Sequence, residues 1–285
     1  MESGADKGGD AVAKAATRTA DDELRADALR ADARRVLTAL RRAAERPPCL
    51  VLLGESNAGK TPLANRLIGD GLLPTSVIAN TRYPLLVRYA DEMSVMAVTA
   101  ACQIVPLDAE STPDPQSITM LEIGLPNQRL RDYEVLDTPA DKEQAVSELP
   151  RLAPLRIPVW CTNATQAWKE SERRTWLAMG RAGRRNGVLA VTRLDRILDE
   201  AQRRRLKLRL EDETAGLFAA IVPSTGMTGT DSALELAERC RRLHARRKRT
   251  VARLTARISA LAGVGPGVED AALPEESERR VATSS

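Results

Sequence analysis

The stretch CLVLLGESNAGKT (residues 49–61) decides the expected fold. It opens with an apolar run, and a short run of this kind before a glycine is typical of a buried parallel strand. The remainder, GESNAGKT, matches G-x-x-x-x-G-K-[ST], a loop that binds nucleotide phosphates between a strand and a helix. The predicted phosphate-binding residues are Gly54, Glu55, Ser56, Asn57, Ala58, Gly59, Lys60 and Thr61.

The residue types in this loop explain its expected chemistry. Gly54 and Gly59 allow the backbone to wrap closely around phosphate oxygens, with amide hydrogens pointing inward. Lys60 supplies a positive charge to the β- and γ-phosphates, and Thr61 offers a hydroxyl to Mg²⁺. The helix that begins here adds the positive end of its dipole, so the loop predicts a nucleotide site that requires Mg²⁺.

Apolar runs and helical patterns alternate along the rest of the chain. Strands are predicted at residues 83–89, 94–100, 117–123, 133–137, 158–163, 187–192 and 217–223. Helices are predicted directly after the loop and over residues 168–183 and 198–214. This alternation is typical of an α/β fold with a mainly parallel central sheet flanked by helices, here a P-loop NTPase domain.

Two further motifs distinguish a GTPase from other nucleotide-binding proteins. VLDTPA (residues 135–140) places Asp137 at the end of an apolar run, where GTPases have D-x-x-G. The aspartate of that motif holds Mg²⁺ through water, and the glycine amide contacts the γ-phosphate. Ala140 stands where the glycine is expected; it keeps the amide but has less backbone freedom.

The second motif, AVTRLD (residues 190–195), resembles the guanine-reading [NT]-K-x-D element. Asp195 and Thr192 fit this pattern, whereas Arg193 replaces the usual lysine. Ser224 follows the next predicted strand, where GTPases place a base-contacting serine. The order of these motifs behind the phosphate loop predicts GTP binding, with an ATP-dependent kinase as an alternative.

The stretch LLPTSVIANTRYPLLVRY (residues 72–89) resembles switch I of dynamin-family GTPases, and GESNAGKT is similar to the phosphate loop of bacterial dynamin-like proteins. The resemblance covers roughly residues 48–230. It implies that Thr81 holds Mg²⁺ and positions the attacking water, and that Asn57 helps to hold a monovalent cation such as K⁺. It also implies a homodimer across the nucleotide face. The implied catalytic residues are Lys60, Thr81, Asn57 and Ser56, and the implied metal ligands are Thr61, Thr81 and Asp137.

The resemblance therefore predicts a small dynamin-like GTPase that hydrolyses GTP as a conformational or assembly switch. Ser56 is shorter than the glutamine, or similar polar residue, that helps to order the catalytic water in dynamins, and Ala140 departs from the motif as well. For this reason a GTP-binding interaction module with little hydrolysis stays open. A ribosome-associated GTPase is a further alternative.

The regions around this domain complete the expected organisation. Residues 1–20 and 263–285 are predicted to be disordered, residues 47–230 form the GTPase domain, and helices are predicted over 21–46 and 231–262. Dynamins build a short bundle from a helix before the GTPase domain and a helix after it. The resemblance therefore implies that these two helices pack antiparallel through their stripes, with no room for a long stalk. The stripes comprise Leu29, Ala33, Val36, Leu40 and Ala43 on the first helix, and Arg247, Val251, Leu254, Ile258 and Leu261 on the second.

The net charge of +4 is concentrated in RCRRLHARRKRTVARLTAR (residues 239–257). Such a helix is either a solvated face or a contact for an anionic membrane surface or RNA. No apolar run approaches the roughly 18 residues of a membrane span, and no apolar stretch follows the N-terminus. A cytoplasmic protein, peripheral to a membrane if the basic helix binds one, is expected.

Composition excludes several other functions. His244 is the single histidine, which excludes histidine-based catalytic triads and histidine-rich metal sites. Aromatic residues make up only 2% of the chain, so a stacking groove for single-stranded nucleic acid is not expected. Trp160, Trp168 and Trp176 are predicted to fill the core. The cysteines are scattered without a C-x-x-C motif and are predicted to be buried thiols: Cys49, Cys102, Cys161 and Cys240.

Overall fold

The computed structural model describes residues 25–39, 41, 44–69, 83–101, 103–107, 113–139, 156–184, 186–223 and 230–261. The chain divides into two compact units, of which one spans Ala43–Arg249 and the other joins Met1–Arg42 to Thr250–Ser285. Several predictions fall outside the described residues, so the structure gives no account of them. They concern the two ends for which disorder is predicted, and Leu40, Ala43, Thr81, Cys102, Ala140 and Ser224.

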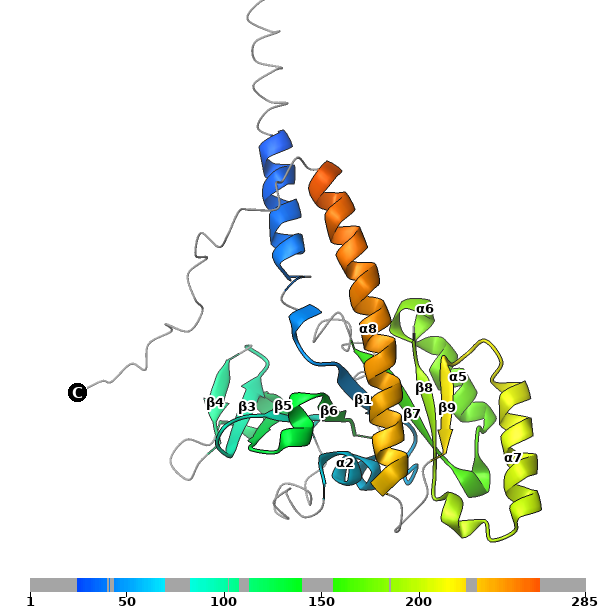
Figure 1. Cartoon of the computed structure of the whole chain (residues 1–285). Helices are drawn as coiled ribbons and strands as arrows, with labels where there is room; N and C mark the ends of the chain where they lie inside the picture. Colours follow the sequence, from blue (N-terminus) through cyan, green and yellow to red (C-terminus); the bar gives the residue numbers. More distant parts are fainter. Residues whose placement is uncertain are drawn as a thin grey trace, which may run out of the picture. The chain divides into compact units, whose positions relative to one another are not determined.

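The larger unit is built on a nine-stranded sheet in the order β4-β3-β5-β2-β6-β1-β7-β8-β9 (Figure 1). β6, β1, β7, β8 and β9 are mutually parallel, whereas β2 runs antiparallel to β6 and β3 runs antiparallel to both of its neighbours. The strands are β1 (Cys49–Leu53), β2 (Leu85–Tyr89), β3 (Ser94–Thr99), β4 (Ile104–Pro106), β5 (Ile118–Leu125), β6 (Glu134–Asp137), β7 (Ile157–Asn163), β8 (Val188–Thr192) and β9 (Ala220–Pro223).

The α/β fold and every predicted strand are confirmed, with ends that differ by a few residues. β4 is an addition that the sequence did not predict, because it is only three residues long and mostly exposed. The helices are α2 (Lys60–Ile68), α5 (Glu170–Ala178), α6 (Gly180–Gly183), α7 (Glu200–Glu213) and α8 (Thr230–Leu261), with a further helix over residues 25–39. The helix predicted over 168–183 is divided, because Gly180, the first residue of α6, has a φ of +67° that interrupts the regular helix after α5.

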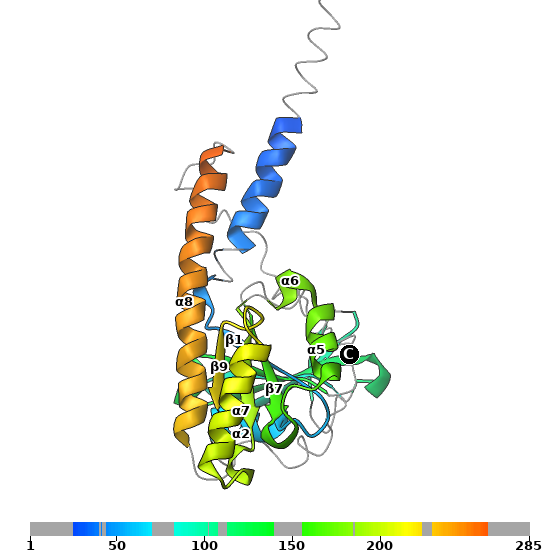
Figure 2. The ribbon, with the colours of Figure 1, turned by 90° about the vertical axis from the view of Figure 1, so that its right-hand side faces the viewer.

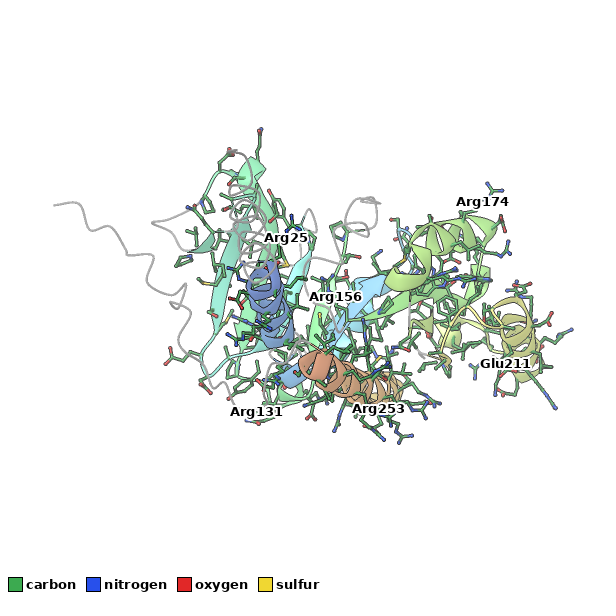
Figure 3. All side chains as sticks on the ribbon, turned by 90° about the horizontal axis from the view of Figure 1, so that it is seen from above. Arg25, Arg131, Arg156, Arg174, Glu211 and Arg253 are labelled. Carbon is green, nitrogen blue, oxygen red and sulfur yellow. The ribbon has the colours of Figure 1, made fainter. Side chains whose placement is uncertain are left out.

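Helices cover both faces of the sheet, which explains why β1 is entirely apolar. Successive side chains of a strand point to opposite faces. Leu50 and Leu52 pack in one core with residues of α2 and α8, and Val51 and Leu53 pack in the other with residues of α5 and α7. Figure 2 shows α8 and α5 on opposite sides of the strands, and Figure 3 shows Arg174 of α5 and Glu211 of α7 projecting outward.

The aromatic residues fill the core between the sheet and α5, as predicted. Trp160, Trp168 and Trp176 are each at most 5% exposed. Trp176 stacks on Phe218 with ring centroids 4.4 Å apart and meets Trp160 edge-on at 5.8 Å. His244 is also buried, and the cysteines within the described residues are buried free thiols: Cys49, Cys161 and Cys240.

Gly187 lies directly against this aromatic cluster. A Cβ at this position would clash with the ring of Trp176. We expect Gly187→Ala to lower the free energy of unfolding by about 1–3 kcal/mol, the usual cost of overpacking a core. Chemical denaturation followed by tryptophan fluorescence measures this change. Gly216→Ala is the control, because no atom lies within 4 Å of its Cβ position and only its φ of +73° opposes the change. Equal losses in the two variants would contradict the steric explanation.

The smaller unit contains two described helical segments, residues 25–39 and residues 250–261 of α8. Among the described residues of this unit, Leu37 and Thr255 have buried side chains, while the predicted stripes are only partly buried. The exposed members of the stripes are Leu29, Val36, Leu254 and Leu261.

Candidate functional site

The phosphate loop connects the carboxyl end of β1 to the first turn of α2. The neighbours of β1 are β6 and β7, and β8 lies beyond β7, all parallel to it. Their carboxyl ends therefore lie at one edge of the sheet, where open α/β sheets bind ligands. This topology brings Asp137, Thr162 and Thr192 to the edge that carries the loop.

The two glycines of the loop are required by its close packing. Gly54 has a φ of +139°, and a Cβ there would clash with the carbonyl oxygen of Cys161. Gly59 has a φ of +86°, and its Cβ would lie 2.9 Å from the Thr192 hydroxyl. Asn57 also adopts the left-handed region, with a φ of 61°. Ser56 and Asn57 are exposed at the tip of the loop, where a ligand can reach them.

Lys60 lies inside the curve of this loop. Its Nζ donates hydrogen bonds to the carbonyl oxygens of Gly54, at 2.7 Å, and Glu55, at 3.0 Å. The side chain is nearly buried, with 7% of the residue exposed. The ammonium group is thus held at the start of α2, where the helix dipole also favours an anion.

Thr61 and Asp137 form a pair next to Lys60. The Thr61 hydroxyl donates to Asp137 Oδ2 at 2.7 Å, although the two residues are far apart in the sequence. Oδ1 of Asp137 is buried and has no hydrogen-bond partner. Burial raises the pKa of Asp137, and the Thr61 hydrogen bond and the Lys60 charge oppose that rise. A hydroxyl and an orphaned carboxylate oxygen are hard oxygen donors of the kind that Mg²⁺ requires, so the residues present fit this ion.

Thr192 has a structural task in addition to its predicted place in the base-reading motif. Its hydroxyl lies 2.7 Å from the carbonyl oxygen of Ala58, to which it donates, and 3.2 Å from that of Thr162. It thereby fastens the phosphate loop to β7 and β8. Arg193 follows in the left-handed region with a φ of 55°, and Asp195 is exposed in the next turn. These residues lie at the same edge of the sheet as the phosphate loop, where the predicted base-reading motif is expected.

A polar network at the start of α5 was not predicted from the sequence. The Thr162 hydroxyl donates to Glu172 Oε2 at 2.9 Å, and the backbone nitrogen of Lys169 donates to the same oxygen at 2.9 Å. Glu172 is only 2% exposed, and burial raises its pKa. The spacing of three residues between Lys169 and Glu172 is that of a capping box and was the available signal, but the usual Ser or Thr is absent.

Comparisons of the chain with models of protein families and with curated proteins find no match. Among solved structures, the chain is similar to a protein of an oligomerised bacterial dynamin pair described as a mechanism for long-range sensing and tethering of membranes. The TM-score is 0.53 at 15% sequence identity, over 73% of this chain and 38% of that one. This likeness shows that most of this chain shares its fold with part of that bacterial dynamin, and the chain spans little more than a third of that protein.

Two further solved structures are similar at a lower level. A variant of Era from Aquifex aeolicus, bound to GDP and AlF4⁻, has a TM-score of 0.40 at 14% identity over 68% of this chain and 56% of that one. The elongation factor SelB of Methanococcus maripaludis, in complex with the GTP analogue GppNHp, has a TM-score of 0.38 at 12% identity over 68% of this chain and 32% of that one.

Among the described residues, no helix has the length and apolar character needed to cross a membrane.

Proposed function

We propose that this chain binds GTP together with Mg²⁺ and hydrolyses it to GDP and phosphate, as a conformational or assembly switch of the dynamin-like type. One observation carries the proposal. The Thr61–Asp137 pair lies beside Lys60 at the carboxyl edge of the sheet, and Asp137 keeps a buried oxygen without a partner. This combination has no evident structural purpose, whereas it suits a nucleotide phosphate with its metal ion.

Each group has a task in an in-line attack of water on the γ-phosphate. Lys60 and the loop amides stabilise the charge that develops on the phosphate oxygens. Thr61 and Asp137, with Thr81 by resemblance, would hold Mg²⁺, which neutralises phosphate charge when bound. The resemblance further assigns the positioning of water to Thr81 and Ser56. It assigns to Asn57 the binding of a cation such as K⁺, which adds positive charge.

The motif AVTRLD (residues 190–195) supports guanine as the base of the bound nucleotide. Asp195 would accept hydrogen bonds from the base, with Thr192, Arg193 and Ser224 completing the base site. Asp195 is exposed and lies after β8, two strands away from β1, which supports this assignment. Calorimetry with GTP, GDP and ATP tests it, and binding of ATP as tight as GTP would favour the kinase alternative.

A GTP-binding interaction module is the second candidate. Ser56 supports it, because this residue lies exposed at the loop tip and has a short side chain where dynamins have glutamine. Phosphate release with Mg²⁺ and K⁺, measured on the sample used for calorimetry, distinguishes the candidates. Turnover of GTP would support the hydrolysing switch. Tight GTP binding without turnover would support the interaction module instead.

Partners of this switch are likewise proposals. The resemblance favours a second copy bound across the nucleotide face. The basic stretch 239–257 is a candidate contact for an anionic membrane surface or RNA. Exposed arginines of α8 in the larger unit recur at helical spacing, which places them on one face: Arg239, Arg242, Arg246 and Arg249. Co-sedimentation with anionic vesicles or ribosomes at low and high salt tests this contact. A lack of binding at low salt would rule out the proposed contact.

Asp137 allows a direct test of the metal assignment. We expect Asp137→Asn to weaken Mg²⁺-dependent GTP binding about ten-fold, because a charged ligand is lost. Only the ionised carboxylate binds the metal, and burial raises the pKa of Asp137. Mg²⁺ affinity should therefore begin to fall at a higher pH than for an ordinary aspartate, and the variant should lose this dependence. Calorimetry across pH with and without Mg²⁺ measures both effects.

The matched control for this variant is Asp132→Asn, which changes an exposed aspartate just before the opposite end of β6. It should bind GTP and Mg²⁺ as the natural chain does. If both variants keep the same Mg²⁺ dependence, Asp137 does not hold the metal.

A further inference from the structure

Glu55 presents an electrostatic problem within the phosphate loop. Its carbonyl oxygen accepts hydrogen bonds from Lys60 Nζ, at 3.0 Å, and from the Ala58 amide, at 3.2 Å. The backbone of Glu55 is therefore part of the curve that would surround the phosphates. A carboxylate at this position repels an anionic ligand unless its charge is balanced or held away.

The structure shows that the Glu55 carboxylate is held by the start of α5. Lys169 Nζ lies 3.2 Å from Glu55 Oε2, and the two side chains are 45% and 31% exposed. The Ser171 hydroxyl donates to the same carboxylate. These contacts outweigh desolvation and lower the pKa of Glu55, so it is ionised at neutral pH. The N-terminus of α5 also favours a negative charge at this place.

The start of α5 is itself firmly anchored. The backbone nitrogens of Trp168 and Lys169 donate to the Thr162 hydroxyl, at 3.0 Å, and to Glu172 Oε2, at 2.9 Å. The carbonyl oxygen of Thr162 faces the Thr192 hydroxyl, which donates to the phosphate loop at Ala58. Lys169 is thus attached to the same network that holds the loop, and it acts on Glu55 from a fixed backbone.

We propose that Lys169, together with Ser171, is a positioning residue of the nucleotide site: it holds the Glu55 carboxylate on α5 and away from the nucleotide phosphates. The inference rests on the proposed function. It assigns Lys169 an action through Glu55 rather than a contact with the nucleotide. Without Lys169, the Glu55 carboxylate is free to approach the phosphates and repel them.

A double-mutant cycle tests this assignment by calorimetry of Mg²⁺–GTP binding to the full chain. Lys169→Met should weaken binding about three- to five-fold at low salt, the scale of a partly exposed charge interaction. The Glu55→Gln/Lys169→Met double variant should bind as tightly as Glu55→Gln alone, because the charge that Lys169 restrains is gone. Lys169→Arg should retain the affinity of the natural chain.

Lys207→Met is the matched control, since Lys207 pairs with Glu211 on α7, outside the loop. High salt should reduce the difference between Lys169→Met and this control, which a loss of folded structure would not do. A double variant as weak as Lys169→Met would overturn the inference in favour of a direct contact with the nucleotide. Equal affinities of Lys169→Met and Lys207→Met would overturn it as well. If the natural chain itself binds no GTP, the proposed function fails instead.

Discussion

Replacing Lys60 by methionine is expected to weaken GTP binding on the order of 100-fold and to abolish turnover. Lys60 Nζ donates to two carbonyl oxygens of its own loop and is nearly buried, so its charge is fixed within the curve of the loop. Hydrogen bonds to charged groups contribute about 1.5–3 kcal/mol each, which corresponds to roughly ten- to 100-fold in affinity. Calorimetry with GTP and a phosphate-release assay measure the two effects.

Lys60→Arg should be almost as defective as Lys60→Met. Lys60 is nearly buried, and its Nζ is held between the carbonyl oxygens of Gly54 and Glu55, which leaves little space for a larger head group. A planar guanidinium is larger than an ammonium group and requires a different hydrogen-bond geometry. Lys207→Met again provides a lysine-to-methionine control on the outer surface. Tight GTP binding by Lys60→Met would show that this loop does not bind the nucleotide.

The local parts of this site could be predicted from the sequence because their spacing is fixed by backbone geometry. The eight-residue loop identifies itself through Gly54, Gly59 and Lys60, and the apolar runs identify the parallel core strands. Asp137 could be found because it ends such a run. In each case a short segment contains the whole signal, and the parallel topology then brings the strand ends together.

The tertiary polar contacts could not be predicted in this way. Glu55 and Lys169 lie 114 residues apart, and their contact depends on how the loop after β7 folds against the loop after β1. Thr192 appeared in the sequence as part of a base-reading motif, yet its hydroxyl reaches the loop because β8 lies beside β7. Such contacts depend on strand order and register, which hydrophobic periodicity does not encode.

Asp195→Asn is expected to weaken GTP binding about 100-fold and to create binding of xanthosine triphosphate. Guanine presents ring and exocyclic N–H donors to a carboxylate, whereas an asparagine places its own donors against them. Xanthine has a carbonyl in place of the exocyclic amine and therefore complements the amide. A site built to hydrogen-bond one partner strongly rejects another whose donors are reversed.

The control for this exchange lies in the same segment. Asp199 caps α7 by accepting a hydrogen bond from the Ala201 nitrogen at 2.9 Å, and asparagine is an equally good cap. Asp199→Asn should therefore retain both stability and GTP preference. Competition of GTP and xanthosine triphosphate for a fluorescent GTP analogue measures the change in both variants. Unchanged GTP preference in Asp195→Asn would show that another group reads the base, because a carboxylate that accepts from guanine cannot be exchanged for an amide without reversing the preference.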